Sequence, residues 1–512
     1  MKKNRMLINL IASIVSLLIN MGISFFLTPF IVSKIGKEAN GFIQLANNFV
    51  SYASIITVAL NSVAGRFITI KIHEKDEEGA NVYFNSVVVA NTIISAFLSL
   101  ISIFIIIYLD RILNIPGNLV TDVKITFAIV FFNFILTVMT SVFNVATFAR
   151  NRLDLSSLRE IEGNFIRVVT LIVLFYFLEP KVFYVSIAIL LMKIFSATKN
   201  FQYLKRLLPE VKFNYKKYSF KAIKELLSLG IWNSVNNLST VLLSGLDLMI
   251  ANLLISAEAM GTMSVAKAIP TVFTTFLATI GGVYAPKFTI LYAEGKRQEL
   301  IDEIKLSMKV LGLIAAVPLI GFAVFGTEFY TLWLPKESIE TIKTIQILSL
   351  LEIGPRFASL YVFTLYNINT ITKKLKTPVL LTLCISIVST IVVMILVNTT
   401  NLGVYAIVGV SSVFMILRVI IFVPTYAAYS LKENLTIFYK PMLKGMGSFI
   451  VITGLFILIK RFIVINSWLD LFLVAFFVGI LGYVVNTFLI LNKNERNIVL
   501  GKIKAKIKFK KI

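Results

Sequence analysis

Seven charged side chains lie inside long apolar segments of this sequence, where a charge is costly unless it faces protein interior or water. Five of the seven are cations, so positive charge is in excess within these segments. A cavity lined by such residues is expected to bind an anion. The positive residues are Arg167, Lys193, Lys267, Arg356 and Arg418, and the negative residues are Asp247 and Glu352.

Each of these charges also has a simpler explanation. Glu352 and Arg356 are four residues apart on one predicted helix and could neutralise each other instead of facing a ligand. Asp247 could bind a coupling proton or sodium ion, or it could pair with Lys267. Arg167 is only several residues into its segment and could snorkel to the membrane surface. Two deeper cations could reach headgroups if their helices tilt, namely Lys193 and Arg418.

Polar residues form stripes on the predicted helices, and two successive stripes recur 220 residues later. Steps of three and four residues keep each stripe on one helix face. Two halves that each turn a polar face away from lipid indicate a transporter with a water-accessible cavity at a repeat interface. The paired stripes are Ser13, Ser16, Asn20 and Ser24 with Asn233, Asn236, Thr240 and Ser244, then Gln44, Asn47, Ser51 and Ser54 with Ser264, Lys267, Thr271 and Thr274.

The composition places these elements in a bilayer. With 57% apolar residues, 42 Phe and a mean hydropathy of +0.87 over 512 residues, the chain has too little polar surface for a soluble globule. We therefore predict an all-α polytopic membrane protein with about fourteen transmembrane helices. The predicted spans are 7–32, 42–65, 82–109, 124–148, 161–178, 182–200, 225–255, 262–285, 306–326, 341–368, 377–397, 403–427, 441–459 and 467–491.

The net charge of +24 is a topology signal and does not indicate nucleic-acid binding. Most of the 50 Lys and Arg residues fall in alternate loops and in the two tails, which predicts that both termini are cytoplasmic. The single cysteine, Cys384, excludes intramolecular disulfides, and the single histidine, His73, lies in a predicted loop. We expect no metal and no cofactor.

The predicted domains follow from the repeat. Both halves begin inside and contain an even number of helices, so they have the same orientation and form a parallel repeat. The Lys-rich tail is expected to contact anionic lipid or to enforce the topology. The predicted domains are an N-terminal six-helix bundle (1–200), a basic cytoplasmic linker (201–224), a C-terminal six-helix bundle (225–430), two additional transmembrane helices (431–492) and the tail (493–512).

The sequence contains none of three common catalytic motifs. The sequence lacks a phosphate-binding GxxxxGK[ST] loop, an HExxH helix and a GxSxG elbow. The longest predicted outside loop, about 327–340, is too short to form a catalytic domain. The protein is therefore not expected to be an enzyme.

The segment from Leu18 to Gly41 resembles the opening of bacterial polysaccharide biosynthesis flippases. Asn20, Pro29, Gly36, Glu38 and Gly41 carry the likeness, and Gly65-Arg66-Phe67 fits it as well. Asn40 departs from the pattern, because a bulkier and often aromatic residue is expected there. This family is the polysaccharide transporter branch of the multidrug/oligosaccharidyl-lipid/polysaccharide flippase superfamily.

The resemblance implies a flippase that moves a polyprenyl-pyrophosphate-linked oligosaccharide from the cytoplasmic to the outer leaflet of the bacterial cytoplasmic membrane. Implied partners are that glycan, membrane lipids and other polysaccharide-assembly proteins, with no nucleic acid. Alternatives are a cation-coupled multidrug exporter of the same fold, a peptidoglycan or teichoic precursor flippase, and a scramblase or scaffold. The predicted substrate cavity contains Asn20, Lys193, Asn236, Thr240, Lys267, Arg356 and Arg418, and Asp247 and Glu352 are predicted to couple an ion or form an ion pair.

Overall fold

The computed structural model describes the backbone of residues 2–150, 152–493 and 495–496, with their side chains except those of 2–14, 16, 17 and 153. These residues form helices and connecting turns, and no β-strand occurs among them. The Ser13 and Ser16 side chains and almost all of the predicted tail 493–512 lie outside the described residues.

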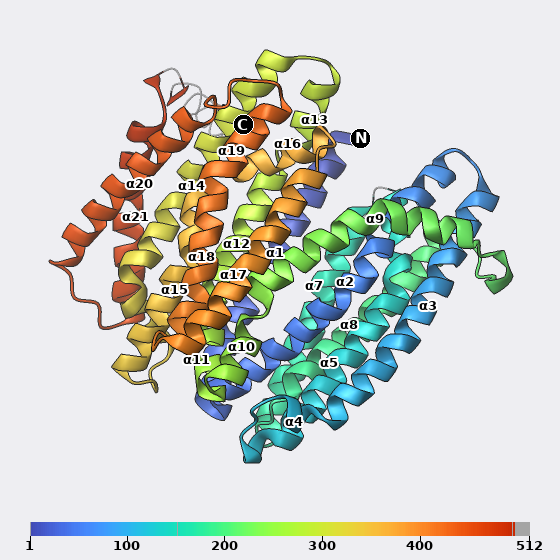
Figure 1. The fold of residues 1–512 in the computed structure, drawn as a ribbon, viewed down its shortest axis with the longest axis horizontal. Coiled ribbons are helices and arrows are strands. Elements are labelled where there is room, and N and C mark those ends of the chain that lie inside the picture. Colours follow the sequence, from blue (N-terminus) through green and yellow to red (C-terminus); the bar gives the residue numbers. More distant parts are fainter. Residues whose placement is uncertain (1, 151, 494, 497–512) are drawn as a thin grey trace, which may run out of the picture. The chain divides into compact units, whose positions relative to one another are not determined.

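The helices follow the predicted spans closely, with extensions at most ends (Figure 1). The first part of the chain contains α1 (Lys2–Ile35), α2 (Lys37–His73), α3 (Glu77–Ile107), α4 (Leu109–Ile112), α5 (Val120–Thr140), α6 (Val145–Ala149), α7 (Leu153–Phe177) and α8 (Tyr184–Leu207). The middle contains α9 (Phe220–Thr240), α10 (Asp247–Leu254), α11 (Ala257–Ala266), α12 (Ala268–Gly282), α13 (Ala285–Ala293), α14 (Arg297–Trp333), α15 (Ile339–Ser359) and α16 (Tyr366–Ile371). The last part contains α17 (Lys376–Thr399), α18 (Val404–Leu417), α19 (Val423–Ser430), α20 (Tyr439–Lys460) and α21 (Trp468–Ile490).

By length and composition, ten helical segments of the described chain could cross a membrane, or up to twelve if each of two bent pairs is one span. The bent pairs are α9 with α10, at 41°, and α15 with the segment 363–371, at 64°. α7 and α8 have 25 and 24 residues and coincide with two further predicted spans, but their charges and polar residues keep them out of this set. The predicted all-α, multi-span fold class is confirmed.

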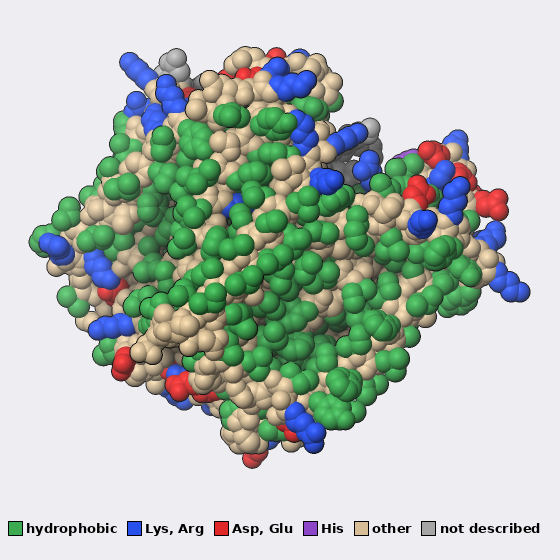
Figure 2. Space-filling view, viewed as in Figure 1, with side chains coloured by type: hydrophobic (Ala, Val, Ile, Leu, Met, Phe, Trp, Pro, Cys, Tyr) green, Lys and Arg blue, Asp and Glu red, His purple; other side chains and the backbone are tan. Residues whose placement is uncertain are grey.

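The surface matches this architecture. Figure 2 shows hydrophobic side chains over most of the visible face, with charged side chains gathered at its edges. Many large apolar side chains are exposed, including Phe462 at 86% and Tyr176 at 80%. In water such a surface would be strongly unfavourable, whereas lipid solvates it.

The helix bounds repeat at the spacing seen in the polar stripes. The segments Lys37–His73 and Ala257–Ala293 both have 37 residues and begin 220 positions apart. α3 and α14 begin at Glu77 and Arg297, which are also 220 positions apart. The duplicated stripes therefore lie on helices whose starting points are duplicated in the same register.

The equivalent turns of the two repeats meet at two glycines. A Cβ on Gly41 would lie 3.1 Å from the Cα of Gly261, and a Cβ on Gly261 would lie 2.7 Å from the backbone of Lys37. Larger side chains could not enter this contact without moving the backbone. Asn40, which departs from the family pattern, donates a hydrogen bond to the Ser264 hydroxyl at 2.8 Å.

The chain divides into two compact units. The limits between them lie inside α11, near the start of α17 and inside α18. The first unit contains the residues up to Val265 together with Val379–Ile407, and the second contains Ala266–Pro378 and the residues from Val408 onward. In the first unit, α2 packs along α9, and Gly230 is required there because a Cβ would overlap the Ala59 carbonyl. In the second unit, the apolar core forms among α12, α14, α15, α19, α20 and α21. The predicted domain limits stay a prediction.

Prolines inside the second unit leave backbone carbonyls without their helical donors, and hydroxyl groups bind those carbonyls. Pro270 cannot donate to Ala266, whose carbonyl accepts a hydrogen bond of 2.8 Å from Ser349. For Pro355 the corresponding carbonyl is that of Leu351, and Ser412 donates to it at 2.6 Å. For Pro318 it is that of Ile314, and Tyr483 donates to it at 3.0 Å. These contacts explain how broken helices persist where water is scarce.

Candidate substrate-binding site

Three charged residues of the second unit form one cluster, which we call the Glu352 cluster: Lys267, Glu352 and Arg356. Glu352 and Arg356 lie one turn apart on α15, and Lys267 lies at the break between α11 and α12. The carboxylate of Glu352 is 3.3 Å from Lys267 Nζ and 3.8 Å from Arg356 Nη1. All three side chains are largely buried, with exposed fractions of 15%, 11% and 17%. Two cations thus share one carboxylate.

Further hydrogen bonds fix the position of Arg356. Its Nε donates to the hydroxyl of Thr274 at 3.0 Å, and its Nη1 donates to the backbone carbonyl of Glu352 at 2.9 Å. Further along, Asn367 donates to the Gly281 carbonyl at 3.1 Å. Thr274, a residue of the predicted polar stripe that begins at Ser264, therefore contacts the Glu352 cluster. Glu352 therefore neutralises Arg356 only in part, because the same carboxylate also contacts Lys267.

A second cationic site lies inside the first unit, and we call it the Lys193 cavity. It has a volume of about 110 Å³ and is enclosed by α5, the 3-10 turn Ser141–Asn144, α7 and α8. Hydroxyl, amide and charged groups line much of it. The polar residues that line it are Thr137, Thr140, Ser141, Asn144, Arg159, Glu160, Lys193, Ser196 and Asn200.

The charges of the Lys193 cavity are arranged differently from those of the Glu352 cluster. Arg159 donates from Nη1 to the amide oxygens of Asn144, at 3.0 Å, and Asn200, while its buried Nε has no hydrogen-bond partner in the described part of the chain. Lys193 is half-buried and forms no ion pair with any residue of the described chain. Glu160 lines the same cavity but is an exposed residue. The cavity therefore presents cationic groups with unused hydrogen-bonding capacity.

The remaining predicted residues are spread over both units. Arg418 lies at the start of a π-helical turn, with its guanidinium carbon 5.7 Å from the centre of the Tyr366 ring. Its buried Nε forms no hydrogen bond with any residue that the structure describes. Asp247 is 3% exposed and opens α10 directly after a second π turn. Asn236 and Thr240 are exposed on one face of α9.

Asn20 lies on α1 and is half-buried. The structure therefore brings Lys267, Glu352 and Arg356 together in the second unit. It does not gather the other predicted residues into that cluster. The pairing of Asp247 with Lys267 stays a prediction.

Sequence reasoning missed Arg159, Asn144 and Asn200. Arg159 lies two residues before the predicted span at 161, but α7 begins at Leu153 and carries Arg159 into the bundle. Asn144 and Asn200 lie at the ends of predicted spans, where polar residues are ordinary. A prediction that this helix begins before residue 161 would have placed Arg159 on the same helix bundle as Lys193.

Solved transporter structures share this fold. An inward-facing multidrug resistance MATE family transporter of the MOP superfamily superimposes with a TM-score of 0.68 at 15% identity, covering 82% of this chain and 96% of that chain. A MOP superfamily transporter from Pyrococcus furiosus superimposes with a TM-score of 0.59 at 17% identity, covering 83% and 96%. This chain therefore has the two-lobed helical fold of MOP superfamily transporters and is a multi-pass membrane protein. Both neighbours are described as transporters.

At the level of sequence, the chain belongs to the family of the membrane protein EpsK of Bacillus subtilis (strain 168), a protein described as uncharacterized. The two are 30% identical over 497 residues, which cover 97% of this chain and 98% of EpsK. No protein-family model matches the chain.

Proposed function

We propose that this protein is a flippase that moves a polyprenyl-pyrophosphate-linked oligosaccharide from the cytoplasmic to the outer leaflet for surface polysaccharide assembly. The observation that carries the proposal is the Lys193 cavity, where a cation within a predicted span forms no ion pair with a described residue. A charge in such a place is costly unless a ligand or water compensates for it. A pyrophosphate supplies the compensating anion.

The polar surroundings fit the rest of such a substrate. Amide and hydroxyl groups line the Lys193 cavity and the exposed face of α9 at Asn236 and Thr240. These groups suit a hydroxyl-rich sugar, and Arg418 offers a further cation whose Nε forms no hydrogen bond within the described structure. The lipid chain can stay in the bilayer while the head group passes.

The proposed mechanism is alternating access without covalent chemistry, in which two helix bundles rock around the substrate. Membrane potential favours outward movement of a negative charge by about 2.3 kcal/mol per charge at roughly 100 mV, inside negative. Asp247 or Glu352 could take up a coupling ion. The chain is proposed to lie in the bacterial cytoplasmic membrane with both termini inside, as the distribution of Lys and Arg predicts.

A cation-coupled multidrug exporter is the second candidate, because MATE multidrug transporters share the fold and Glu352 is a largely buried carboxylate. An organic cation would need acidic cavity walls, whereas Glu352 already contacts two cations. The Pyrococcus furiosus neighbour is described as having a binding pocket of reversed polarity that suggests a different function. That precedent supports a member of this fold with a substrate of opposite charge.

The test is transport by the purified full-length protein in proteoliposomes. Flipping of a polyprenyl-pyrophosphate oligosaccharide is scored by its loss of accessibility from the starting leaflet, with and without an imposed potential. Efflux of rhodamine 6G is measured in parallel. We expect protein-dependent flipping without dye efflux, and dye efflux without flipping would support the exporter instead.

A further inference from the structure

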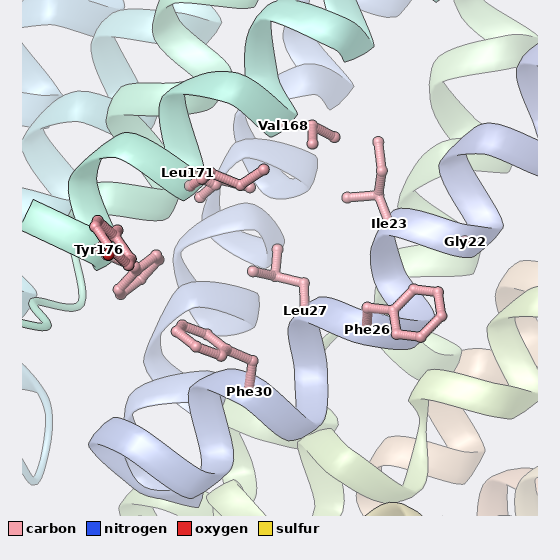
Figure 3. A pocket seen from close by; sticks show the side chains of 10 residues that line it. Gly22, Ile23, Phe26, Leu27, Phe30, Val168, Leu171 and Tyr176 are labelled. Atoms are coloured by element: carbon pink, nitrogen blue, oxygen red, sulfur yellow. The ribbon is translucent and has the colours of Figure 1, made fainter.

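An open apolar groove runs along the first unit between α1 and α7. It has a volume of about 500 Å³, and Figure 3 shows Ile23 and Leu27 of α1 facing the same space as Leu171 of α7. Phe30 and Phe175 meet edge to face at its far end, with their ring centres 5.0 Å apart. The groove covers eight residue steps on each helix, which corresponds to a length of about 12 Å. The full lining is Gly22, Ile23, Phe26, Leu27, Phe30, Val168, Leu171, Ile172, Phe175 and Tyr176.

Two polar residues of α7 with unmet hydrogen-bonding capacity each lie one helical turn before a residue that lines this groove. Asn164 lies one turn before Val168 and is fully buried, yet neither its amide nitrogen nor its amide oxygen has a hydrogen-bond partner among the described residues. Arg167 lies one turn before Leu171, its buried Nε has no hydrogen-bond partner, and it forms no ion pair with a described residue. An apolar groove that ends at an uncompensated cation fits a ligand with a hydrocarbon chain and an anionic head.

We propose that the groove between α1 and α7 binds the polyisoprenyl chain of a polyprenyl phosphate lipid, with the phosphate at Arg167. In a polyprenyl phosphate, the first chain carbon is bonded directly to a phosphate oxygen. The chain can therefore begin at Val168 while the phosphate contacts the adjacent residue, Arg167. A glycerophospholipid would place its ester oxygens between phosphate and chain, in a groove whose lining is almost wholly apolar.

This assignment rests on the proposed function, because it specifies how the lipid part of the substrate is held. Arg167 itself lies six residues into the predicted span that begins at 161, which corresponds to about 9 Å along the helix. A bulk lipid phosphate remains at the membrane surface, whereas a substrate phosphate on its way across the membrane passes this level.

Photo-crosslinking of the full-length protein tests the proposal. The probes are a polyprenyl phosphate with a diazirine in its first isoprene units, the same polyprenol without phosphate, and a phosphatidylglycerol with a diazirine in one acyl chain, each in phosphatidylcholine vesicles. We expect the polyprenyl phosphate to label residues 22–30 and 168–176 preferentially. Equal labelling of these segments by all three probes would overturn the proposal, because it would mean that the groove holds bulk lipid.

Two variants make the test specific. Gly22→Leu fills the groove, and Gly479→Leu on α21 is its matched control, because a Cβ meets no atom within 4 Å at either position. We expect Gly22→Leu to lower polyprenyl phosphate labelling to the level of phosphatidylglycerol and Gly479→Leu to leave it unchanged. Arg167→Gln is expected to lower it about tenfold, because a charged hydrogen bond is lost, while Arg461→Gln serves as the control.

The flipping assay separates this proposal from the proposed function. Flipping by the wild type with labelling outside the groove would overturn the groove assignment and leave the flippase proposal standing. Groove labelling without flipping of any pyrophosphate-linked glycan would support the groove and overturn the flippase proposal.

Discussion

The Glu352 cluster and the Lys193 cavity each contain two cations and one carboxylate, but their charges are arranged differently. In the Glu352 cluster the carboxylate lies within 4 Å of both cations. In the Lys193 cavity Arg159 contacts neutral amide oxygens, Lys193 forms no ion pair with a described residue, and the carboxylate of Glu160 belongs to an exposed residue. The two sites therefore have the same charge composition but differ in how far the charges neutralise one another. In the Glu352 cluster the carboxylate largely neutralises the cations, whereas in the Lys193 cavity the cations can bind an incoming anion.

The largest expected effect is that of Glu352→Gln, which leaves Lys267 and Arg356 side by side without their shared carboxylate. Removal of one partner from a buried ion pair typically costs about 3 to 5 kcal/mol of folding stability. We expect a clear fall in the thermal unfolding temperature of the protein in detergent. Glu340→Gln, at an exposed position on the same helix, is the control, and equal unfolding temperatures for the two variants would show that the cluster does not stabilise the fold.

The next effect is on transport. Lys193→Met removes a cation that forms no ion pair with a described residue, so we expect folding stability to be kept or raised. Loss of one charged contact to a pyrophosphate should slow flipping about tenfold, or ~1.4 kcal/mol. Lys193→Arg, which keeps the charge, should retain most of the rate. Unchanged flipping in Lys193→Met would remove Lys193 from the substrate path.

A smaller effect on folding stability is expected from Ser349, whose hydroxyl binds a backbone carbonyl at the helix break beside Lys267. Ser349→Ala removes the donor to the Ala266 carbonyl, which Pro270 cannot replace, and should cost about 1 to 3 kcal/mol of folding stability. Ser99→Ala is the control, because the Ser99 hydroxyl bonds to a carbonyl of its own helix. Similar unfolding temperatures for the two variants would mean that the break needs no such support.

The smallest effect is expected for the exposed ion pair of Asp110 and Lys124, whose charged atoms are 2.7 Å apart. The hydrogen bond from Lys124 lowers the pKa of Asp110, so any contribution of this carboxylate is present at neutral pH and is lost as the pH falls through its folded-state pKa. Because solvent screens such pairs, Asp110→Asn should leave the unfolding temperature at neutral pH within experimental error. A large decrease would show that exposed pairs of this protein resemble the Glu352 cluster in strength.

Much of the fold was predictable because lipid imposes a simple rule on helix length. The apolar runs gave helices such as α3 and α17 within a few residues, and the 220-residue repeat recurs in the helix starts at Lys37 and Ala257. The positions at which helices break were harder to predict from the sequence. Pro270 and Pro355 lie near two of them, but the π turns at 241–245 and 418–422 depend on packing that single-sequence periodicity does not contain.

The candidate sites were predictable only in part. The sequence identified Lys267, Glu352 and Arg356 as buried charges, and the spacing of the last two predicted their contact. The contact of Lys267 with Glu352 depends on which helices lie side by side, which the sequence alone does not specify. Arg159 was missed because the predicted span began at 161 and the helix begins at Leu153.

Cations of the membrane-spanning helices are proposed to select an anionic lipid head group, and charge selectivity in proteoliposomes tests this most directly. The flipping rate of a pyrophosphate-linked oligosaccharide is compared with that of a neutral lipid bearing the same oligosaccharide, in the wild type and in Lys193→Met. We predict that the wild type prefers the pyrophosphate-linked substrate by about tenfold or more and that the variant loses most of this preference. Equal wild-type rates for the charged and neutral lipids would contradict the claim.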